Sequence, residues 1–163
     1  TIVNWMLEST VFQIKCQIIR SSWHENAFDH TANDIDGYMY VLNVDDNNKY
    51  SLIFKKRVDN LTVGVSYEFS AYLTNIRKPE HNSNDPNILF QVNEIAIAKN
   101  STGDIEESNP MTWKKYGVAF KAPNVSVILL MISMKKDRDG NNLAIDDIEL
   151  RACSNQSSTS STD

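Results

Sequence analysis

The sequence predicts a single all-β domain built as an antiparallel β-sandwich. Apolar residues recur at every second position in most apolar segments, which is the pattern of strands with one buried and one solvated face. Clusters of Asn, Asp, Gly and Pro separate these segments at short intervals and indicate turns. The chain has 163 residues, of which 41% are hydrophobic. This composition suffices for one packed core, and no segment carries a capped helical pattern longer than roughly two turns.

The expected strands follow one another along the whole chain. Apolar and polar residues alternate strictly in Phe12–Ile18, whereas Val125–Met134 is apolar on both faces and predicts a central strand covered on its second side. In chain order the expected strands are Phe12–Ile18, Gly37–Val44, Tyr50–Val58, Tyr67–Thr74, Ile88–Asn93, Tyr116–Lys121, Val125–Met134 and Leu143–Leu150. Asn75 and Asn87 bracket the turn-rich Lys78–Pro86 loop, and we expect their side chains to hold it by hydrogen bonds.

The charge and the apolar runs argue against two classes of partner. The formal net charge is −5, and a chain with this surplus would repel the phosphates of a nucleic acid. The longest apolar run, Val127–Ile132, has the length of a strand, and a membrane helix needs roughly 18–20 apolar residues. We therefore expect neither nucleic-acid binding nor membrane insertion. The acidic surplus suits a cation or an uncharged ligand better.

The end of the chain differs in composition from the rest. Ser154–Asp163 is rich in Ser and Thr and almost free of apolar residues, so it cannot pack and is expected to be a linker or tail. The packed domain is therefore expected to span residues 1–153. Thr1 begins the chain without the basic and apolar pattern of a signal peptide. We expect a module of a longer protein that contains other domains.

An acidic loop is the first candidate functional segment. Asp29, Thr31, Asp34 and Asp36 lie within a stretch, residues 21–48, that contains no Lys or Arg. Carboxylates crowded in this way repel one another, and a bound hard cation relieves the repulsion. Calcium takes about six to eight oxygen ligands, and these four side chains supply such oxygens. The alternative is a solvated acidic turn without metal.

A pair of adjacent carboxylates is the second candidate. Asp146 and Asp147 interrupt the apolar segment Leu143–Leu150. Successive strand residues point to opposite faces, so one of the two must point inward or lie on a β-bulge. A buried carboxylate needs a cation or several N–H groups. We expect Asp146, in preference to Asp147, to meet the Asp29 loop at a shared calcium ion; the alternative is a carboxylate that caps backbone amides without metal.

Three motifs resemble those of a known family. Asp29-His30-Thr31, followed by Gly37-Tyr38-Met39-Tyr40-Val41, resembles a segment of MAM domains, as does Trp113-Lys114-Lys115-Tyr116. Asn142–Ile148, followed by Cys153, is similar to their closing motif and to that of galactose-binding-like jelly rolls, which include carbohydrate-binding modules. The resemblance covers roughly Trp23 to Cys153. It implies a jelly roll with structural calcium, in an extracellular, non-catalytic domain that works in adhesion or glycan binding.

Catalytic motifs do not stand out in the sequence. His24, His30 and His81 have no metal-ligand spacing, and no Gly-rich phosphate loop or nucleophile elbow is present. Two carboxylates could serve a glycosidase, but Asp146 and Asp147 are adjacent in a strand that is expected to be largely buried. We therefore expect a binding module that is not an enzyme.

A carbohydrate site needs aromatic faces flanked by polar groups. Trp23 and His24 lie in a polar loop, and Tyr72 lies on the polar side of its strand. Gln91 and Asn93 are expected on a solvated face of the same kind, so that these residues form one polar, aromatic-containing concave surface. The alternatives are that Trp23 plugs the edge of the sandwich and that the others belong to an ordinary sheet surface. A flat apolar patch would instead favour a protein partner, as in MAM domains.

Two further features point to a secreted or cell-surface chain. Cys16 and Cys153 lie near opposite ends and are candidates for a disulfide, with two unrelated thiols as the alternative. Four N-glycosylation sequons fall in expected loops or the tail, at Asn60, Asn100, Asn124 and Asn155. The sequence thus predicts an extracellular glycan-binding module, with a cell-surface protein as the alternative partner.

Overall fold

The computed structural model describes residues 2–4, 13–14, 22–25, 27–31, 37–43, 51–79, 84–135 and 141–153. Every structural statement below concerns these residues. Within them the chain forms strands and turns and no helix, as the alternating pattern predicts. In particular, the described part contains no helix long and apolar enough to span a membrane.

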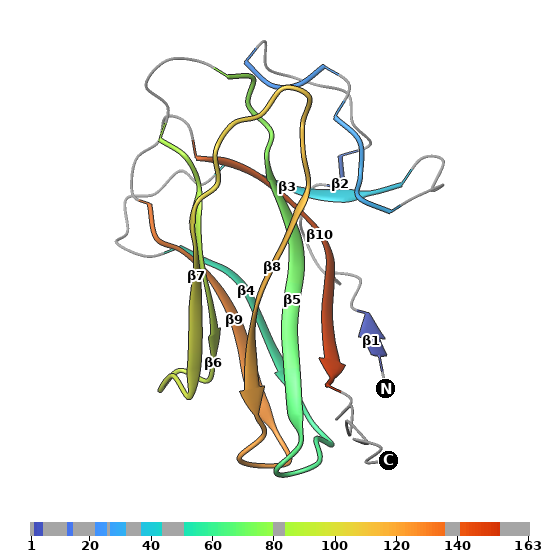
Figure 1. Cartoon of the computed structure of the whole chain (residues 1–163), viewed down its shortest axis with the longest axis vertical. Coiled ribbons are helices and arrows are strands. Elements are labelled where there is room, and N and C mark those ends of the chain that lie inside the picture. The colour runs from blue at the N-terminus through green and yellow to red at the C-terminus, as the bar shows by residue number, and fades with distance from the viewer. Residues whose placement is uncertain are drawn as a thin grey trace, which may run out of the picture.

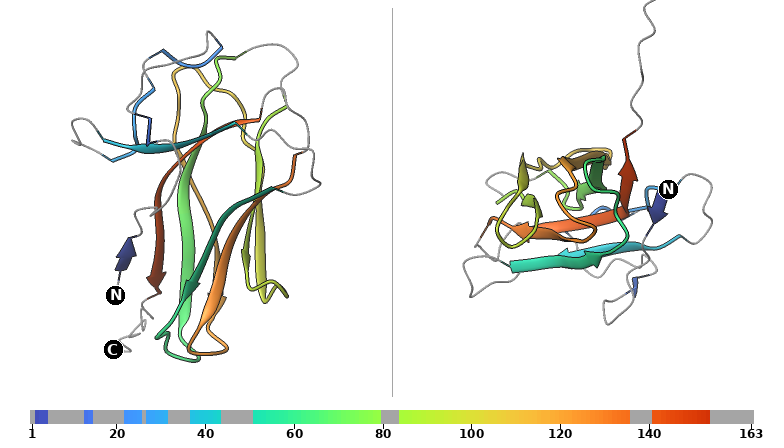
Figure 2. Two further views of the ribbon diagram at one scale, coloured as in Figure 1. Left: turned by 180° about the vertical axis from the view of Figure 1, so that it is seen from behind. Right: turned by 90° about the horizontal axis from the view of Figure 1, so that it is seen from below.

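Two antiparallel sheets face each other as a sandwich (Figures 1 and 2). The larger sheet has the order β2-β3-β10-β5-β8, with β1 also paired to β10. Its strands are β1 (Ile2–Asn4), β2 (Gln13–Ile14), β3 (Met39–Asn43), β5 (Ser66–Asn75), β8 (Lys114–Lys121) and β10 (Asn142–Ala152). The smaller sheet has the order β4-β9-β6-β7, and its strands are β4 (Ser51–Val58), β6 (Asn87–Val92), β7 (Ala98–Asp104) and β9 (Val127–Ser133).

This strand order is that of a jelly roll, so the predicted fold class is confirmed. The predicted central position of the Val125–Met134 strand is also correct, because β9 lies between β4 and β6. Two of the strands, β1 and β7, were not predicted. β7 occupies a stretch that was expected to begin a loop, and most of its side chains are exposed, so it carries no alternating pattern.

The main core lies between the sheets. Its aromatic centre is Phe69, whose ring contacts those of Phe54 and Phe90 at centroid distances of 5.9 and 5.3 Å. Phe69, Phe90, Leu73 and Leu143 are fully buried. Such burial contributes about 1.5–3 kcal/mol for each large apolar side chain and supplies most of the stability of the fold.

A second apolar cluster lies on the outer face of the larger sheet, near one end. It is formed by Met39, Ile76, Met111 and Ala144, with Trp23, Ala27, Val41 and Trp113 packed against it. Met39 and Val41 alternate along β3 with Tyr40 and Leu42, which face the main core, so this cluster must lie on the opposite face. It packs residues of the 22–31 segment against the sheet and thereby positions the site described next.

Candidate functional site

A β-bulge in β10 presents two adjacent carboxylates. β10 pairs with β5 through Asp146 opposite Tyr72, and pairing resumes only at Glu149 opposite Ser70, with a register shift between the two. Ile145 and Ile148 both face the main core, and Asp147 has a φ of 46°, in the left-handed region that Asp tolerates better than most residues. The predicted break in alternation is confirmed, and the bulge lets neither carboxylate enter the core.

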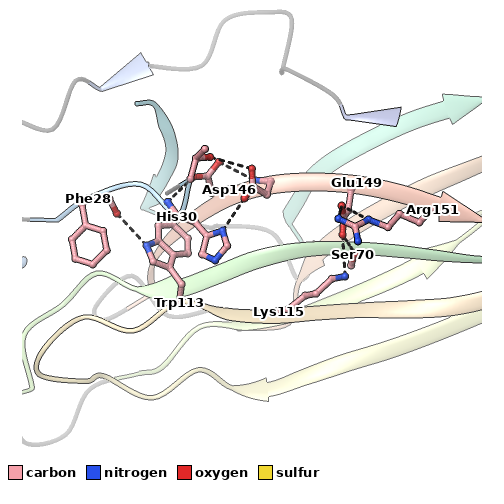
Figure 3. A network of polar contacts seen from close by, with 10 residues as sticks. Phe28, His30, Ser70, Trp113, Lys115, Asp146, Glu149 and Arg151 are labelled. Carbon is pink, nitrogen blue, oxygen red and sulfur yellow. Dashed lines mark hydrogen bonds and ion pairs between the residues drawn. The ribbon is translucent and has the colours of Figure 1, made fainter. Parts of the chain in front are cut away.

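Asp146 anchors the 27–31 segment through its backbone. Its Oδ2 accepts a hydrogen bond from the His30 N–H at 2.8 Å, and its Oδ1 accepts one from the Asp147 N–H at 2.7 Å (Figure 3). Partial burial raises the pKa of the Asp146 carboxyl group, and the two backbone hydrogen bonds oppose this rise. Asp146 therefore caps two backbone amides, and its role as a calcium ligand stays a prediction.

Asp147 binds side chains of the same segment. Its Oδ2 lies 2.7 Å from His30 Nδ1, and its Oδ1 accepts a hydrogen bond from the Thr31 hydroxyl at 3.3 Å. An ionised carboxylate only accepts hydrogen bonds, so His30 Nδ1 must carry the proton. His30, Thr31, Asp146 and Asp147 are called the clasp below. The clasp brings residues of the Asp29 loop against the last strand, and a shared calcium ion at this place stays a prediction.

Aromatic rings fix the imidazole of the clasp. The His30 ring stacks on Tyr72 at a centroid distance of 3.4 Å and meets Trp113 edge-on at 6.1 Å. Trp113 Nε1 also donates a hydrogen bond to the Phe28 carbonyl oxygen at 3.1 Å (Figure 3). These contacts hold the segment against β5 and β8. Sequence reasoning did not identify His30 as a site residue, although it lies between Asp29 and Thr31.

The oxygen donors near the clasp suit a hard cation in kind. Asp147 and Thr31 offer a carboxylate and a hydroxyl, and Asp29 is half-buried in the same segment. Asp34 and Asp36 lie outside the described residues. In the described part of the chain no three His, Cys, Asp or Glu side chains gather as a metal-binding group. Since both Asp146 oxygens already hold backbone amides, Asp146 suits the role of loop anchor better than that of ligand.

Two exposed aromatic side chains flank residues 29–31 in the sequence. Phe28 precedes them in the chain and is 57% exposed, and Tyr38 is 55% exposed. Tyr38 directly precedes β3. The antiparallel pairing of β3 with β10 ends at Tyr40 opposite Ile145, so the chain before Tyr40 runs in the direction of the bulge at Asp147. Neither residue was predicted as part of a site. Tyr38 stands in a motif quoted for the family resemblance, but its exposure could not be deduced from the sequence.

Trp23 and His24, predicted as ligand-binding residues, lie at the end of the larger sheet, beyond β5. Trp23 is half-buried in the second apolar cluster and forms a backbone bridge with Arg77. The His24 N–H donates to the Ile76 carbonyl oxygen at 3.0 Å. The 22–24 segment therefore extends along the end of β5, and this position matches the alternative in which Trp23 plugs the edge of the sandwich.

The predicted grouping of Tyr72 with Gln91 and Asn93 is wrong. Tyr72 lies on β5 in the larger sheet, whereas Gln91 lies on β6 in the smaller one, followed by Asn93 in the next turn. Gln91 Nε2 donates to the Asn93 carbonyl oxygen at 2.7 Å, and Asn93 Oδ1 accepts the Ile128 N–H at 2.8 Å. Their side chains thus stabilise a turn. Alternation indicates which side of a strand is solvated and carries no information about the sheet.

A second polar cluster lies farther along the outer face of the larger sheet (Figure 3). Glu149 is almost fully buried and contacts Lys115 at 2.9 Å, Arg151 at 2.6 Å and the Ser70 hydroxyl at 3.2 Å. Lys115 also pairs with Glu68 at 2.7 Å. Partial burial lowers the pKa of Lys115, but its hydrogen bonds to Glu68 and Glu149 outweigh this effect and raise it. These five residues are called the charged network.

The remaining predicted residues concern covalent links. Cys153 is an exposed, free thiol just beyond β10, and Cys16 lies outside the described residues. The structure therefore forms no disulfide at Cys153. Asn60, Asn100 and Asn124 are exposed, as glycan acceptors must be, and Asn155 lies outside the described residues.

Comparison with known proteins shows the fold class. No family model matches the sequence, and no curated protein is significantly similar to it. The structure resembles the C-terminal domain of EclA, a sugar-binding protein, with a TM-score of 0.53 and 16% identity, covering 75% of this chain and 84% of that chain. It also resembles a cyclase from Fischerella sp. TAU, with a TM-score of 0.53 and 12% identity, covering 93% and 84%. The chain therefore has a β-sandwich fold of the kind found in carbohydrate-binding domains.

Proposed function

We propose that this chain is a non-catalytic carbohydrate-binding module of a secreted or cell-surface protein that contains other domains. The observation that carries the proposal is the exposure of two aromatic side chains: Phe28, two residues before His30 of the clasp, and Tyr38, directly before β3. Sugar rings present C–H faces that stack on aromatic rings, and their hydroxyl groups need carboxylates, hydroxyls or imidazoles beside the stack. The likeness to a sugar-binding β-sandwich supports the same class of ligand.

The non-catalytic part of this proposal follows from how the carboxylates are engaged. Partial burial raises the pKa of the Asp146 carboxyl group, and both of its oxygens hold backbone amides. A general acid or base needs a titrating group that can reach the substrate. The cyclase likeness concerns the fold, and the engaged carboxylates favour a binding role over catalysis.

Calcium is proposed as a structural cofactor of the 29–36 loop. Asp147, Thr31 and Asp29 would supply oxygens, Asp34 and Asp36 would add carboxylates, and Asp146 would keep the segment in place through its amides. A cation that binds only the native state raises the melting temperature in proportion to the logarithm of its concentration. An unchanged melting temperature after treatment with a chelator would contradict this cofactor.

A glycan array, read with calcium and with a chelator, tests the binding proposal. We expect binding to a sugar class and a loss of affinity of about two- to tenfold in Phe28→Ala or Tyr38→Ala, since a stacked aromatic ring contributes about 0.5–1.5 kcal/mol. Ile95→Ala is the matched control, because Ile95 is exposed in the β6–β7 turn at the other end of the sandwich. Wild-type affinity in both aromatic variants would reject this site.

A MAM-type adhesion domain is the second candidate function. Leu52, Ile132 and Leu89 are neighbours across β4, β9 and β6, and alternation places them on the outer face of the smaller sheet. Leu52 is exposed, and such an aliphatic row can contact a protein partner. An array without any bound glycan, together with self-association that Leu52→Lys abolishes, would favour this candidate.

A further inference from the structure

Two turns meet at the end of the sandwich opposite the clasp. Residues 59–65 join β4 to β5, and residues 122–126 join β8 to β9, both at the lower end in Figure 1. The Leu61 N–H donates to the Val125 carbonyl oxygen at 2.9 Å, and the Gly64 N–H donates to the Ala122 carbonyl oxygen at 2.8 Å. The two turns are therefore one bonded unit.

Each of these turns contains a sequon. Asn60-Leu61-Thr62 lies in the first and Asn124-Val125-Ser126 in the second, and both asparagines are exposed. Asn60 and Asn124 immediately precede the two residues that share the Leu61–Val125 hydrogen bond, so their backbones lie close together. Asn60 has a φ of 63°, a left-handed conformation that Asn adopts more readily than most residues.

Exposed aliphatic side chains accompany these acceptors. Val125 is the middle residue of one sequon and is 61% exposed, and Val63 follows the other and is 57% exposed. Apolar side chains so exposed at a turn gain by being covered. The C–H faces of a first sugar residue provide such a cover.

The third described sequon is built differently. Asn100 lies within β7, and its Nδ2 donates a hydrogen bond to the Gly117 carbonyl oxygen of β8 at 2.8 Å, which links the two sheets. The hydroxyl of its sequon residue Thr102 accepts the Ile88 N–H at 2.9 Å. Nδ2 is the atom that would carry a glycan, so attachment there would disturb a contact between the sheets.

We propose that Asn60 and Asn124 both carry N-linked glycans, which stand side by side on this end of the domain, while Asn100 serves as an unmodified bridge between the sheets. In the reaction the asparagine Nδ2 forms a bond to C1 of an oligosaccharide and loses a proton. The bond from C1 to its lipid pyrophosphate carrier breaks, and the carrier leaves. The host's transferase supplies this carrier-linked donor in the secretory pathway.

Intact mass and glycopeptide mapping of the full chain, secreted from eukaryotic cells behind an added signal peptide, test the proposal. Thr62→Ala and Ser126→Ala should each remove the mass of one glycan, and the double variant should remove two. These variants leave Asn60 and its unusual φ untouched, and Thr62→Ser, which preserves the sequon, is the matched control. Removal of the glycans by peptide N-glycosidase should convert Asn60 and Asn124 to Asp.

Asn100→Gln separates the bridging role from an acceptor role. We expect its glycan mass to equal that of the wild type and its melting temperature to fall, because the bond to Gly117 is lost. A glycan mapped to Asn100, or unmodified Asn60 and Asn124, would overturn the proposal. The glycan array tests ligand binding at the clasp end of the domain, whereas mass mapping tests glycosylation at the opposite end. A negative result in one experiment therefore leaves the other proposal unaffected.

Discussion

The clasp and the charged network both withdraw carboxylates of β10 from water, and they do so in opposite ways. In the network, Glu149 is neutralised by Lys115 on β8, which lies beyond β5 in the same sheet, and by Arg151 on β10 itself. In the clasp, Asp146 is held by backbone amides, and one of them belongs to a segment 116 residues away in sequence. The network therefore reinforces an existing sheet, whereas the clasp attaches a loop that no strand pairing holds.

The largest expected effect lies beside the network. Gly117 pairs with Ser70, and a Cβ at Gly117 would lie 2.8 Å from Ser70 Cβ and still closer to the Phe69 carbonyl oxygen. Gly117→Ala must therefore shift backbone, and we expect the free energy of unfolding to fall by about 3 kcal/mol. Urea unfolding measures this change. Ala119→Ser, at an exposed position on the same face of β8, is the control and should change stability little.

Asp146→Ala should come next and should act locally. It removes the acceptor of two backbone amides, and we expect a loss of about 2 kcal/mol, since each hydrogen bond to a charged group contributes about 1.5–3 kcal/mol and water replaces part of it. Hydrogen exchange should quicken at His30 and Asp147 far more than in β5. Asp146→Asn keeps an acceptor oxygen and should lose less. Equal acceleration throughout the sheet would show that the clasp is not a separate unit.

Glu149→Gln should lower stability by about 1 kcal/mol, because it removes the charge and keeps the shape. Lys115 retains Glu68, and Arg151 is half exposed, so neither cation is stranded. The loss should spread over β5, β8 and β10 in hydrogen exchange. Glu94→Gln removes an exposed partner of Lys55 and is the control, with no expected change beyond a few tenths of a kcal/mol. If Glu149→Gln accelerated hydrogen exchange only around residue 149, the network would act as locally as the clasp, and the proposed difference between them would be wrong.

The smallest effect is a pH dependence at Glu68. The hydrogen bond from Lys115 lowers the pKa of the Glu68 carboxyl group below its ordinary value of 4.5, against the effect of partial burial. The contribution of ionised Glu68 to the free energy of unfolding is therefore complete above pH 4.5. It is lost as the pH falls through the lower pKa that Glu68 has in the folded protein. Glu68 is 41% exposed, so solvent and salt screen the pair and we expect only a few tenths of a kcal/mol. Comparing wild type with Glu68→Gln by urea unfolding at falling pH measures it, and high salt should shrink the difference.

Period-two alternation and turn residues were enough to predict the sandwich and most of its strands. The Asp146-Asp147 pair broke the alternation, and from this the sequence predicted either a bulge or a buried carboxylate; the bulge is what forms. Asn75 was also predicted correctly, since its Nδ2 donates to Asp85 of the bracketed loop at 3.0 Å. Asn87 bonds instead to Asp104 of β7, which was not predicted as a strand. Patterns within a short segment thus predict a contact correctly when the partner is near in sequence. They also predict a strand correctly when one of its faces must be apolar.

The charged network and the aromatic surroundings of His30 could not be predicted in the same way. Glu68, Lys115 and Glu149 come from strands that are adjacent only after the jelly roll forms, and each looks like an ordinary solvated residue in its own segment. The same limit explains the wrong grouping of Tyr72 with Gln91. Exposure of Phe28 and Tyr38 depends on how the second apolar cluster packs, and that packing is a property of the assembled sheet.

The pairing of β1 with β10 brings the first and the last described strands side by side. Ile2 is the register partner of Arg151. The start of β1 and the end of β10 are therefore separated by one strand spacing, about 5 Å. A domain with such neighbouring ends can be inserted into a surface loop of a host without stretching it.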